Sequence, residues 1–270
     1  MNMKYMDLKK IGYTIALSLG LVGMIAIPVG AAATTPATTT TGTTAKSSAA
    51  ANAAAAKQAA QAAAQQARVQ RIIARGNGEI ARRLVTLNTL SGTISSATKL
   101  TAADAETLNN TVNTDISTLN SLQTKLDAET TVTGAITDAQ SIILSYRVYV
   151  LVVPQVHLIK AADDQQVTEG KLSALSTKLS ARITADSQAN KNVATLQSEL
   201  SDLNAKVAAA QPISSGVESS VIGLQPSDYN TNHSVLGGKR DQLKTAEADI
   251  QAAVTDARNI VNGLVELGNS

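Results

Sequence analysis

The chain of 270 residues contains no cysteine, no tryptophan and no phenylalanine, and aromatic residues make up only 2% of it. Without cysteine the chain has no disulfide framework, no thiolate metal site and no thioether-linked lipid. A core without large aromatic rings has to be thin, because Leu, Ile, Val and Ala bury less area per side chain than Phe or Trp. The stability of such a protein must come from the length of its packed elements.

The chain also lacks an excess of charge of either sign. Of its 23 basic and 21 acidic side chains, Lys4, Lys9, Lys10 and Asp7 lie in residues 1–33, so the remainder carries no net charge. Nucleic-acid binding usually requires a basic surface, so the balance of charge argues against a nucleic-acid partner.

The N-terminal residues follow the pattern of a secretory signal peptide. Three lysines precede an apolar run from Ile11 to Val29, and an alanine triplet that ends at Ala33 follows it. The run approaches the ~20 apolar residues of a membrane span, so an uncleaved anchor is the alternative, although its glycines and Pro28 weaken a spanning helix. We expect a signal peptide over residues 1–33 and an exported protein of the cell envelope or exterior.

Composition divides the rest of the chain. Residues 34–51 consist of Thr, Ala, Ser, Gly and Pro with Lys46 as the only charge, which predicts a disordered linker. Residues 52–76 are strong helix formers in which alanine is the only apolar residue until Val69, which predicts a solvated lead-in helix. Residues 52–270 as a whole are expected to form a helical bundle domain.

Heptad-like spacing of apolar residues runs through that domain. Ile73, Ile80, Leu87 and Ile94 recur at intervals of seven, and the same spacing returns in Leu243, Ile250, Ala257 and Leu264 of a last helix that is expected from about Ser234.

The sequence also marks where helices should begin or break. Thr101 and Asp104 have the spacing of a capping box, which predicts a helix start. A kink or break is expected at Gly76-Asn77-Gly78, a restart at Pro154 and a bend or break at Pro212.

No segment alternates apolar and polar residues for long enough to indicate a sheet. The sequence therefore predicts an all-α fold: an elongated antiparallel helical bundle, or a set of coiled-coil hairpins, of about five to six helices.

The segment from Ser145 to Asp164, SYRVYVLVVPQVHLIKAADD, holds an unusual share of the rare residue types. Between Ile142 and Ile159 apolar residues occupy nearly every helical face, which predicts a segment covered on all sides. The simplest interpretation is the central helix of the bundle. Residues 142–159 could instead insert into a membrane or form an oligomer contact, although Arg147, His157 and Lys160 oppose a stable span. Candidate structural or interaction residues are Tyr146, Arg147, Tyr149, Pro154 and His157.

Catalysis is the third interpretation of this segment and the weakest. His157 and His233 do not have metal-ligand spacing, and the chain has no nucleophile elbow, P-loop or dinucleotide-binding turn. We predict no enzyme and no catalytic, cofactor-binding or metal site.

The chain resembles a family of secreted, coiled-coil-rich bacterial proteins with an S-Y-R-x-Y-x-x-x-x-P-x-x-H-like segment. The residues that match this pattern are Ser145, Tyr146, Arg147, Tyr149, Pro154 and His157. The run EIARRLVTLNTL, residues 79–90, is similar to an earlier helix of that family. The resemblance implies export and a fold of long helices, and it implies no activity.

These observations predict a non-enzymatic structural, adhesive or scaffold protein of the bacterial envelope or exterior, with a protein or cell-surface partner. A membrane-active helical protein that inserts residues 142–159 is the alternative. Heptads look alike whether their partner lies in the same chain or in another, so a homo-oligomer also stays open.

Overall fold

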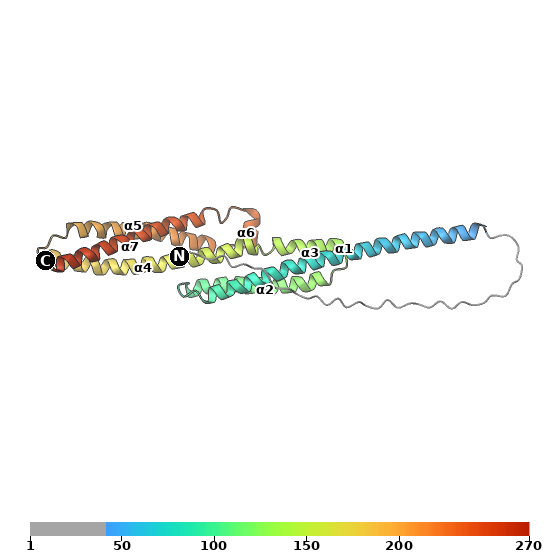
Figure 1. Ribbon diagram of the computed structural model, residues 1–270, viewed down its shortest axis with the longest axis horizontal. Coiled ribbons are helices and arrows are strands. Elements are labelled where there is room, and N and C mark those ends of the chain that lie inside the picture. Colours follow the sequence, from blue (N-terminus) through green and yellow to red (C-terminus); the bar gives the residue numbers. More distant parts are fainter. Residues whose placement is uncertain (1–41, 270) are drawn as a thin grey trace. The chain divides into compact units, whose positions relative to one another are not determined.

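The computed structural model describes residues 42–269, so the expected signal peptide and most of the expected linker lie outside the described range. Within this range the chain forms seven α-helices, one π-helical segment and no β-strand (Figure 1): α1 (Gly42–Ser95), α2 (Ala102–Asp127), α3 (Val132–Leu144), η1 (Val148–Val152), α4 (Val153–Gln188), α5 (Ala194–Val221), α6 (Pro226–Thr231) and α7 (Lys239–Asn269). Six of the α-helices have 13 residues or more. The predicted all-α class and helix number are confirmed.

The helical packing belongs to one compact unit, which begins at Ala53. Helix α1 begins at Gly42 and not at Asn52, so the last residues of the expected linker are helical. Residues 52–68 are all exposed, and burial begins at Val69. This is the solvated stretch expected of the lead-in helix. Alanine keeps this stretch helical without giving it an apolar face that could be buried.

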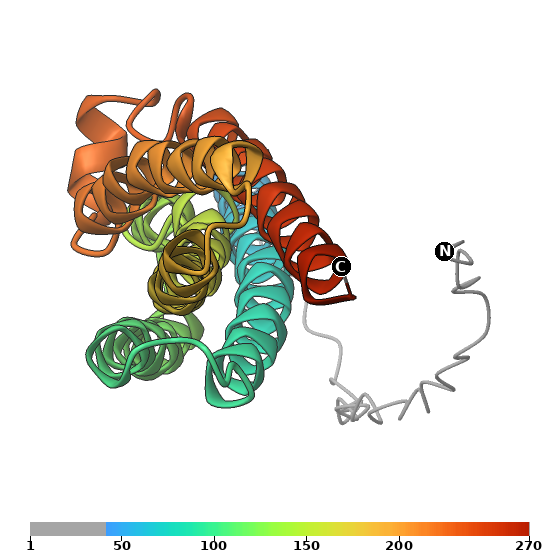
Figure 2. The same cartoon turned by 90° about the vertical axis from the view of Figure 1, so that its left-hand side faces the viewer.

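Hydrogen bonds fix the directions of the helices. Bonds Ser176–Asn204 and Glu169–Ser214 run in opposite sequence order along α4 and α5, so these two helices are antiparallel. Helices α5 and α7 are also antiparallel. Lys206 of α5 bonds to Asp256 of α7, and Lys191, just ahead of α5, donates to the carbonyl oxygen of Leu267 near the end of α7. In Figures 1 and 2 these three helices lie side by side, and their packing is the antiparallel arrangement expected.

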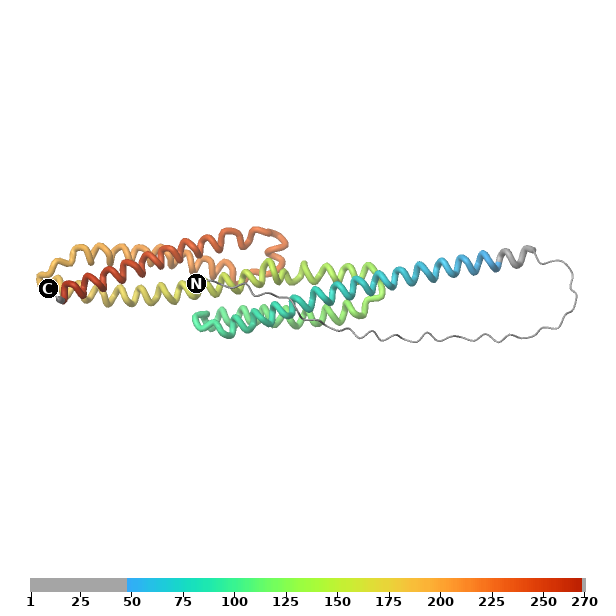
Figure 3. The backbone as a smooth tube through the Cα atoms, viewed as in Figure 1, coloured from blue at the N-terminus to red at the C-terminus, as the bar shows by residue number. Residues whose placement is uncertain are grey.

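Two hydrophobic clusters fill this compact unit. The first joins α1, α2, α3, η1 and the beginning of α4 to the end of α5, at Val217 and Val221, and to Leu243 of α7. The second joins the rest of α4 to the remainder of α5 and α7. In the tube of Figure 3, α4 is the element that continues from one set of neighbours to the other. Helix α4 therefore belongs to both cores, as do α5 and α7 through Val217, Val221 and Leu243.

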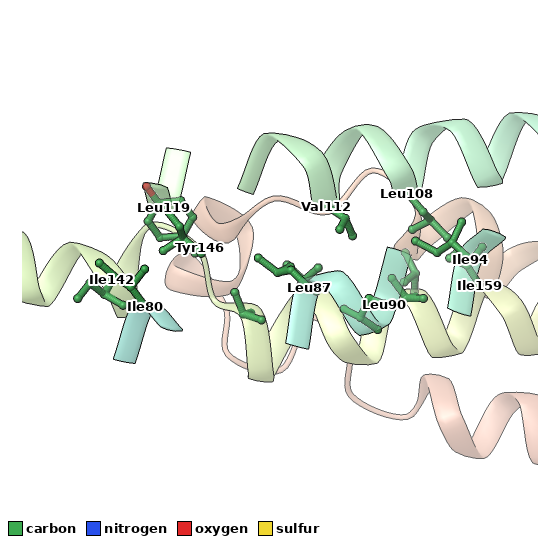
Figure 4. Close-up of a cluster of buried hydrophobic side chains, with 14 of the residues drawn as sticks. Ile80, Leu87, Leu90, Ile94, Leu108, Val112, Leu119, Ile142, Tyr146 and Ile159 are labelled. Atoms are coloured by element: carbon green, nitrogen blue, oxygen red, sulfur yellow. The ribbon is translucent and has the colours of Figure 1, made fainter. Parts of the chain in front are cut away.

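The predicted heptad side chains form these cores. Ile80 and Leu87 are fully buried, and Figure 4 shows them in a row with Leu90 and Ile94, opposite Leu108 and Val112 of α2. The seam of the last helix is also buried at Leu243, Ile250 and Ala257.

Three expected interruptions differ in the structure. The run Gly76-Asn77-Gly78 does not break α1. A Cβ on Gly76 would lie 2.5 Å from Cδ2 of the buried Leu126, so this glycine permits the close approach of α2. Helix α5 is not broken at Pro212, and its neighbours Ala210 and Ser214 are fully buried. The last helix begins at Lys239, because Gly238 with φ +73° ends the preceding turn.

Candidate functional site

The candidate segment contains a break between α3 and α4. Arg147 has a left-handed backbone, with φ 44° and ψ 32°, which is uncommon for a residue with a side chain. The amides of Val150, Leu151 and Val152 all point to the carbonyl oxygen of Arg147, at 3.2, 2.8 and 3.4 Å. The chain therefore turns tightly at Arg147 before it re-enters a helix.

Pro154 lies where the wide, π-helical turn of η1 passes into α4. It occupies the first turn of α4, where its missing N–H costs no helical hydrogen bond, and the π-helical turn of η1 lies directly ahead of it. The N–H of Val153 bonds to the carbonyl of Val148, five residues back. A kink or restart was expected at Pro154, and α4 begins at Val153 next to it; the chain is already helical from Val148, however, so the interruption itself lies at Arg147.

Helix α6 holds the break in place. Arg147 Nε donates to Asn230 Oδ1 at 2.6 Å, and Asn230 Nδ2 donates to the carbonyl oxygen of Leu144 at 3.0 Å. The Arg147 guanidinium also lies over the ring of Tyr229, with Cζ 5.4 Å from the ring centroid. The side chain of Arg147 thus has a structural role in this part of the chain.

The two tyrosines of the segment have different environments. Tyr146 is buried in the first cluster, where Figure 4 shows its ring beside Leu119. Tyr149 is 45% exposed, and its ring lies 5.1 Å from the guanidinium carbon of Arg83 in α1. Arg83 is itself 6% exposed and bonds to Glu79, so Tyr149 covers a buried cation.

The predicted burial of this segment on all sides is wrong. Ile143, Leu144 and Val150 are 49%, 48% and 43% exposed, whereas Val148, Leu151 and Val152 are buried. One face of the segment packs on the first cluster, whereas Ile143, Leu144 and Val150 stay about half exposed and Tyr149 lies against Arg83 of α1. We call Ile143, Leu144, Tyr149 and Val150 the exposed apolar segment.

Pro154 and His157 line a groove of about 590 Å³ between α4 and the chain from Leu236 into α7. Its apolar lining comes from Leu158, Ala161, Leu236 and Leu243 as well as Pro154, and its charged side chains are Arg240, Lys244 and Glu247. His157 is exposed there and makes no hydrogen bond to a carboxylate within the described residues. The groove can hold an apolar group, and it offers no paired acid and base.

Gln155 is a buried polar residue that periodicity did not single out. Its Nε2 donates to the carbonyl oxygens of Val221 and Ile222 at 2.9 Å and of Leu224 at 3.3 Å, at the C-terminal end of α5. The last carbonyls of a helix have no donor within the helix, and in the part of the chain that the structure describes Val221 otherwise accepts only from the Leu224 N–H of the following turn, so Gln155 caps the end of α5. A contact between residues 66 or more positions apart leaves no local signal in the sequence.

Three carboxylates also meet away from the candidate segment. Asp104 of α2, Asp163 of α4 and Glu218 of α5 each offer an oxygen, and these atoms lie within 4.8 Å of one another. Only half of the predicted capping box forms: Thr101 Oγ1 accepts from the Asp104 N–H at 3.1 Å, but Asp104 does not accept from the Thr101 N–H. The N–H of Thr101 itself donates to Asp163 Oδ2 at 2.8 Å, so α4 supplies the second half of the cap.

Burial, together with the neighbouring carboxylates Asp104 and Glu218, raises the pKa of Asp163 to about 6, against the lowering effect of the Thr101 N–H. Asp163 is 1% exposed, and its Oδ1 has no hydrogen-bond donor within the described residues. We call Asp104, Asp163 and Glu218 the carboxylate cluster.

No family model, curated protein or solved structure matches the chain. The resemblance of Tyr146, Arg147, Tyr149, Pro154 and His157 to a secreted coiled-coil family thus stays a prediction. The fold defines the class: an all-α protein of long, antiparallel helices that carries apolar side chains on its surface beside a helix break.

Proposed function

We propose that this chain is a non-catalytic interaction protein of the bacterial cell envelope or exterior, in which the helical bundle presents the exposed apolar segment to a protein partner. The signal-like N-terminal sequence supports export. The surface of the partner should be apolar and lack charge where it meets the segment.

One observation carries the proposal. Of the seven large apolar side chains that are exposed within the described residues, four (Ile143, Leu144, Tyr149 and Val150) lie within eight positions, and the other three are Val85 of α1 and Val261 and Val265 of α7. Full burial of a Val, Leu or Ile side chain is worth about 1.5–3 kcal/mol, so Ile143, Leu144 and Val150 each have about half of that to gain from a partner. The buried neighbours Val148 and Leu151 fix the segment in place, so a partner meets an ordered surface.

Membrane insertion is the second candidate. The helical stretch Val132–Gln188 is long and apolar enough to cross a membrane by length and composition, with 39% of its most apolar window buried in the protein. Insertion would remove Leu151 and Val152 from the core and would separate Arg147 from Asn230 and Tyr229. A charge near the bilayer centre costs at least ~2.5 kcal/mol, which favours a protein partner over a bilayer.

Vesicle co-sedimentation of the purified chain distinguishes the two candidates. We expect the chain to stay in the supernatant with both neutral and anionic phospholipid vesicles, and vesicles loaded with dye to stay sealed. Binding or dye release that Val150→Asp abolishes would overturn the proposal in favour of insertion. Lys160→Gln is the matched control, because it changes a charge on the same helix outside the exposed apolar segment.

A further inference from the structure

The carboxylate cluster concentrates negative charge where three helices meet. Asp163 is 1% exposed and Asp104 is 8% exposed, while Glu218 is half-buried and keeps contact with water. Burial of a charged carboxylate is costly unless another group compensates it. The groups that act on the pKa of Asp163 are two further carboxylates and one backbone N–H, and none of them is a cation.

The hydrogen bonds at the cluster satisfy only part of its oxygens. Asp163 Oδ2 accepts from Thr101, Asp104 Oδ2 accepts from the Thr101 hydroxyl at 2.7 Å, and one oxygen of Glu218 accepts from Gln166. Asp163 Oδ1 is fully buried and has no donor within the described residues. An unpartnered oxygen in a buried side chain indicates that a further group belongs there.

We propose that Asp104, Asp163 and Glu218 bind a hard divalent cation of the Ca²⁺ or Mg²⁺ type. All three ligands are carboxylate oxygens, which such cations prefer to the nitrogen and sulfur ligands of zinc. A divalent cation compensates the charge that the Thr101 N–H and the N-terminal end of α2 offset only in part. Glu218 provides the route from solvent.

The position of the site gives the cation a structural effect. Asp104 belongs to the first turn of α2, Asp163 to α4 and Glu218 to the last turns of α5. A bound cation would therefore tie α2, which belongs to the first hydrophobic cluster, to α4 and α5, which also form the second. Cation binding and helix packing should then stabilise each other.

Isothermal titration calorimetry and thermal unfolding of the full chain test this site, with CaCl₂ and MgCl₂ as probes after removal of metals by EDTA. We expect saturable binding of one ion per chain and an increase in Tm of about 5 °C when the ion is at 100 times its Kd. Asp104→Asn and Glu218→Gln should each weaken binding at least tenfold, because each replaces a charged ligand by a neutral one of the same size.

Asp164→Asn is the matched control. It removes a carboxylate from the neighbouring position of α4, where Asp164 pairs with Lys160 outside the cluster, and it should leave binding unchanged. Glu218→Gln keeps the fold testable, since Glu218 is half-buried and a glutamine oxygen can still accept from Gln166. The absence of saturable heat with both salts, or equal binding by Glu218→Gln and the unmodified chain, would overturn the proposal.

Discussion

Arg147 Nε donates to Asn230 Oδ1 at 2.6 Å, although the two residues are 83 positions apart in the sequence. The bond connects the left-handed residue between α3 and α4 to the short helix α6 between α5 and α7. Asn230 reaches the same break a second time through the carbonyl of Leu144. The geometry of the candidate segment therefore depends on a distant part of the chain.

Asn230→Ala should loosen this break without unfolding the protein. It removes two exposed hydrogen bonds, so we expect a loss of about 1 kcal/mol in the free energy of unfolding. Hydrogen–deuterium exchange should become faster at the amides of residues 150–152 and stay unchanged in α5. Tyr229→Phe is the control, because it keeps the ring beneath Arg147. Equal exchange in Asn230→Ala and the unmodified chain would show that α6 does not hold the break.

Two glycines of α1 should respond in opposite directions to substitution by alanine. A Cβ on Gly78 meets nothing within 4 Å, so Gly78→Ala should stabilise the protein by about 0.5–1 kcal/mol through helix propensity. A Cβ on Gly76 would overlap Leu126, which is fully buried, so Gly76→Ala should destabilise it by about 1–3 kcal/mol. Chemical denaturation measures the free energy of unfolding of both variants. A gain in stability from Gly76→Ala would contradict the close packing of α1 and α2.

Asp115 should make stability depend on pH. Burial raises the pKa of Asp115 to about 6, so the folded state holds a proton more tightly there than the unfolded state, in which an Asp titrates near ~3.9. The stabilisation from that proton is complete below the unfolded pKa and is lost as the pH rises through about 6.

Asp115→Asn removes this titration and should raise the Tm by roughly 2 °C at pH 7.5, with little difference from the unmodified chain near pH 4. Thermal unfolding in EDTA across this range measures the difference. Asp241→Asn, on an exposed side chain paired with Lys244, should show no such gain at pH 7.5. A constant Tm difference between Asp115→Asn and the unmodified chain at all pH values would exclude a raised pKa.

Val150 and Leu151 are adjacent residues that should tolerate a charge very differently. Val150 is 43% exposed, so Val150→Asp should change the free energy of unfolding by about 0.5 kcal/mol or less. Leu151 is fully buried, so Leu151→Asp should cost more than ~4 kcal/mol and leave the chain largely unfolded. Circular dichroism during thermal unfolding compares the two variants. If Val150→Asp also unfolded the chain, the segment would have to be buried on every side.

The sequence contained enough to predict the parts of the fold that depend on local patterns. The seam of Ile80 and Leu87 is buried, and the Thr101 cap begins α2, because helix periodicity and capping act within a few residues. A kink or break was expected at Gly76-Asn77-Gly78, and α1 is not broken there; the reason for Gly76 is its packing on Leu126, 50 positions away, which no local pattern reveals.

The candidate site depends more strongly on tertiary contacts. Periodicity identified an apolar segment, but it could not show which face the rest of the bundle covers, and so Val150 was expected to be buried. The role of Arg147 required the position of Asn230, and the carboxylate cluster required three helices to meet. Charged residues at such separations have no common spacing in the sequence.

Site-specific photo-crosslinking at Val150 in the cells that produce the protein tests the central claim most directly. A photoreactive residue at Val150 should form a discrete adduct with a protein, while the same residue at Asn110, an exposed polar position of α2, should not. Adducts at Val150 with lipid alone, or equal adducts at both positions, would contradict the claim that the exposed apolar segment is a surface for a protein partner.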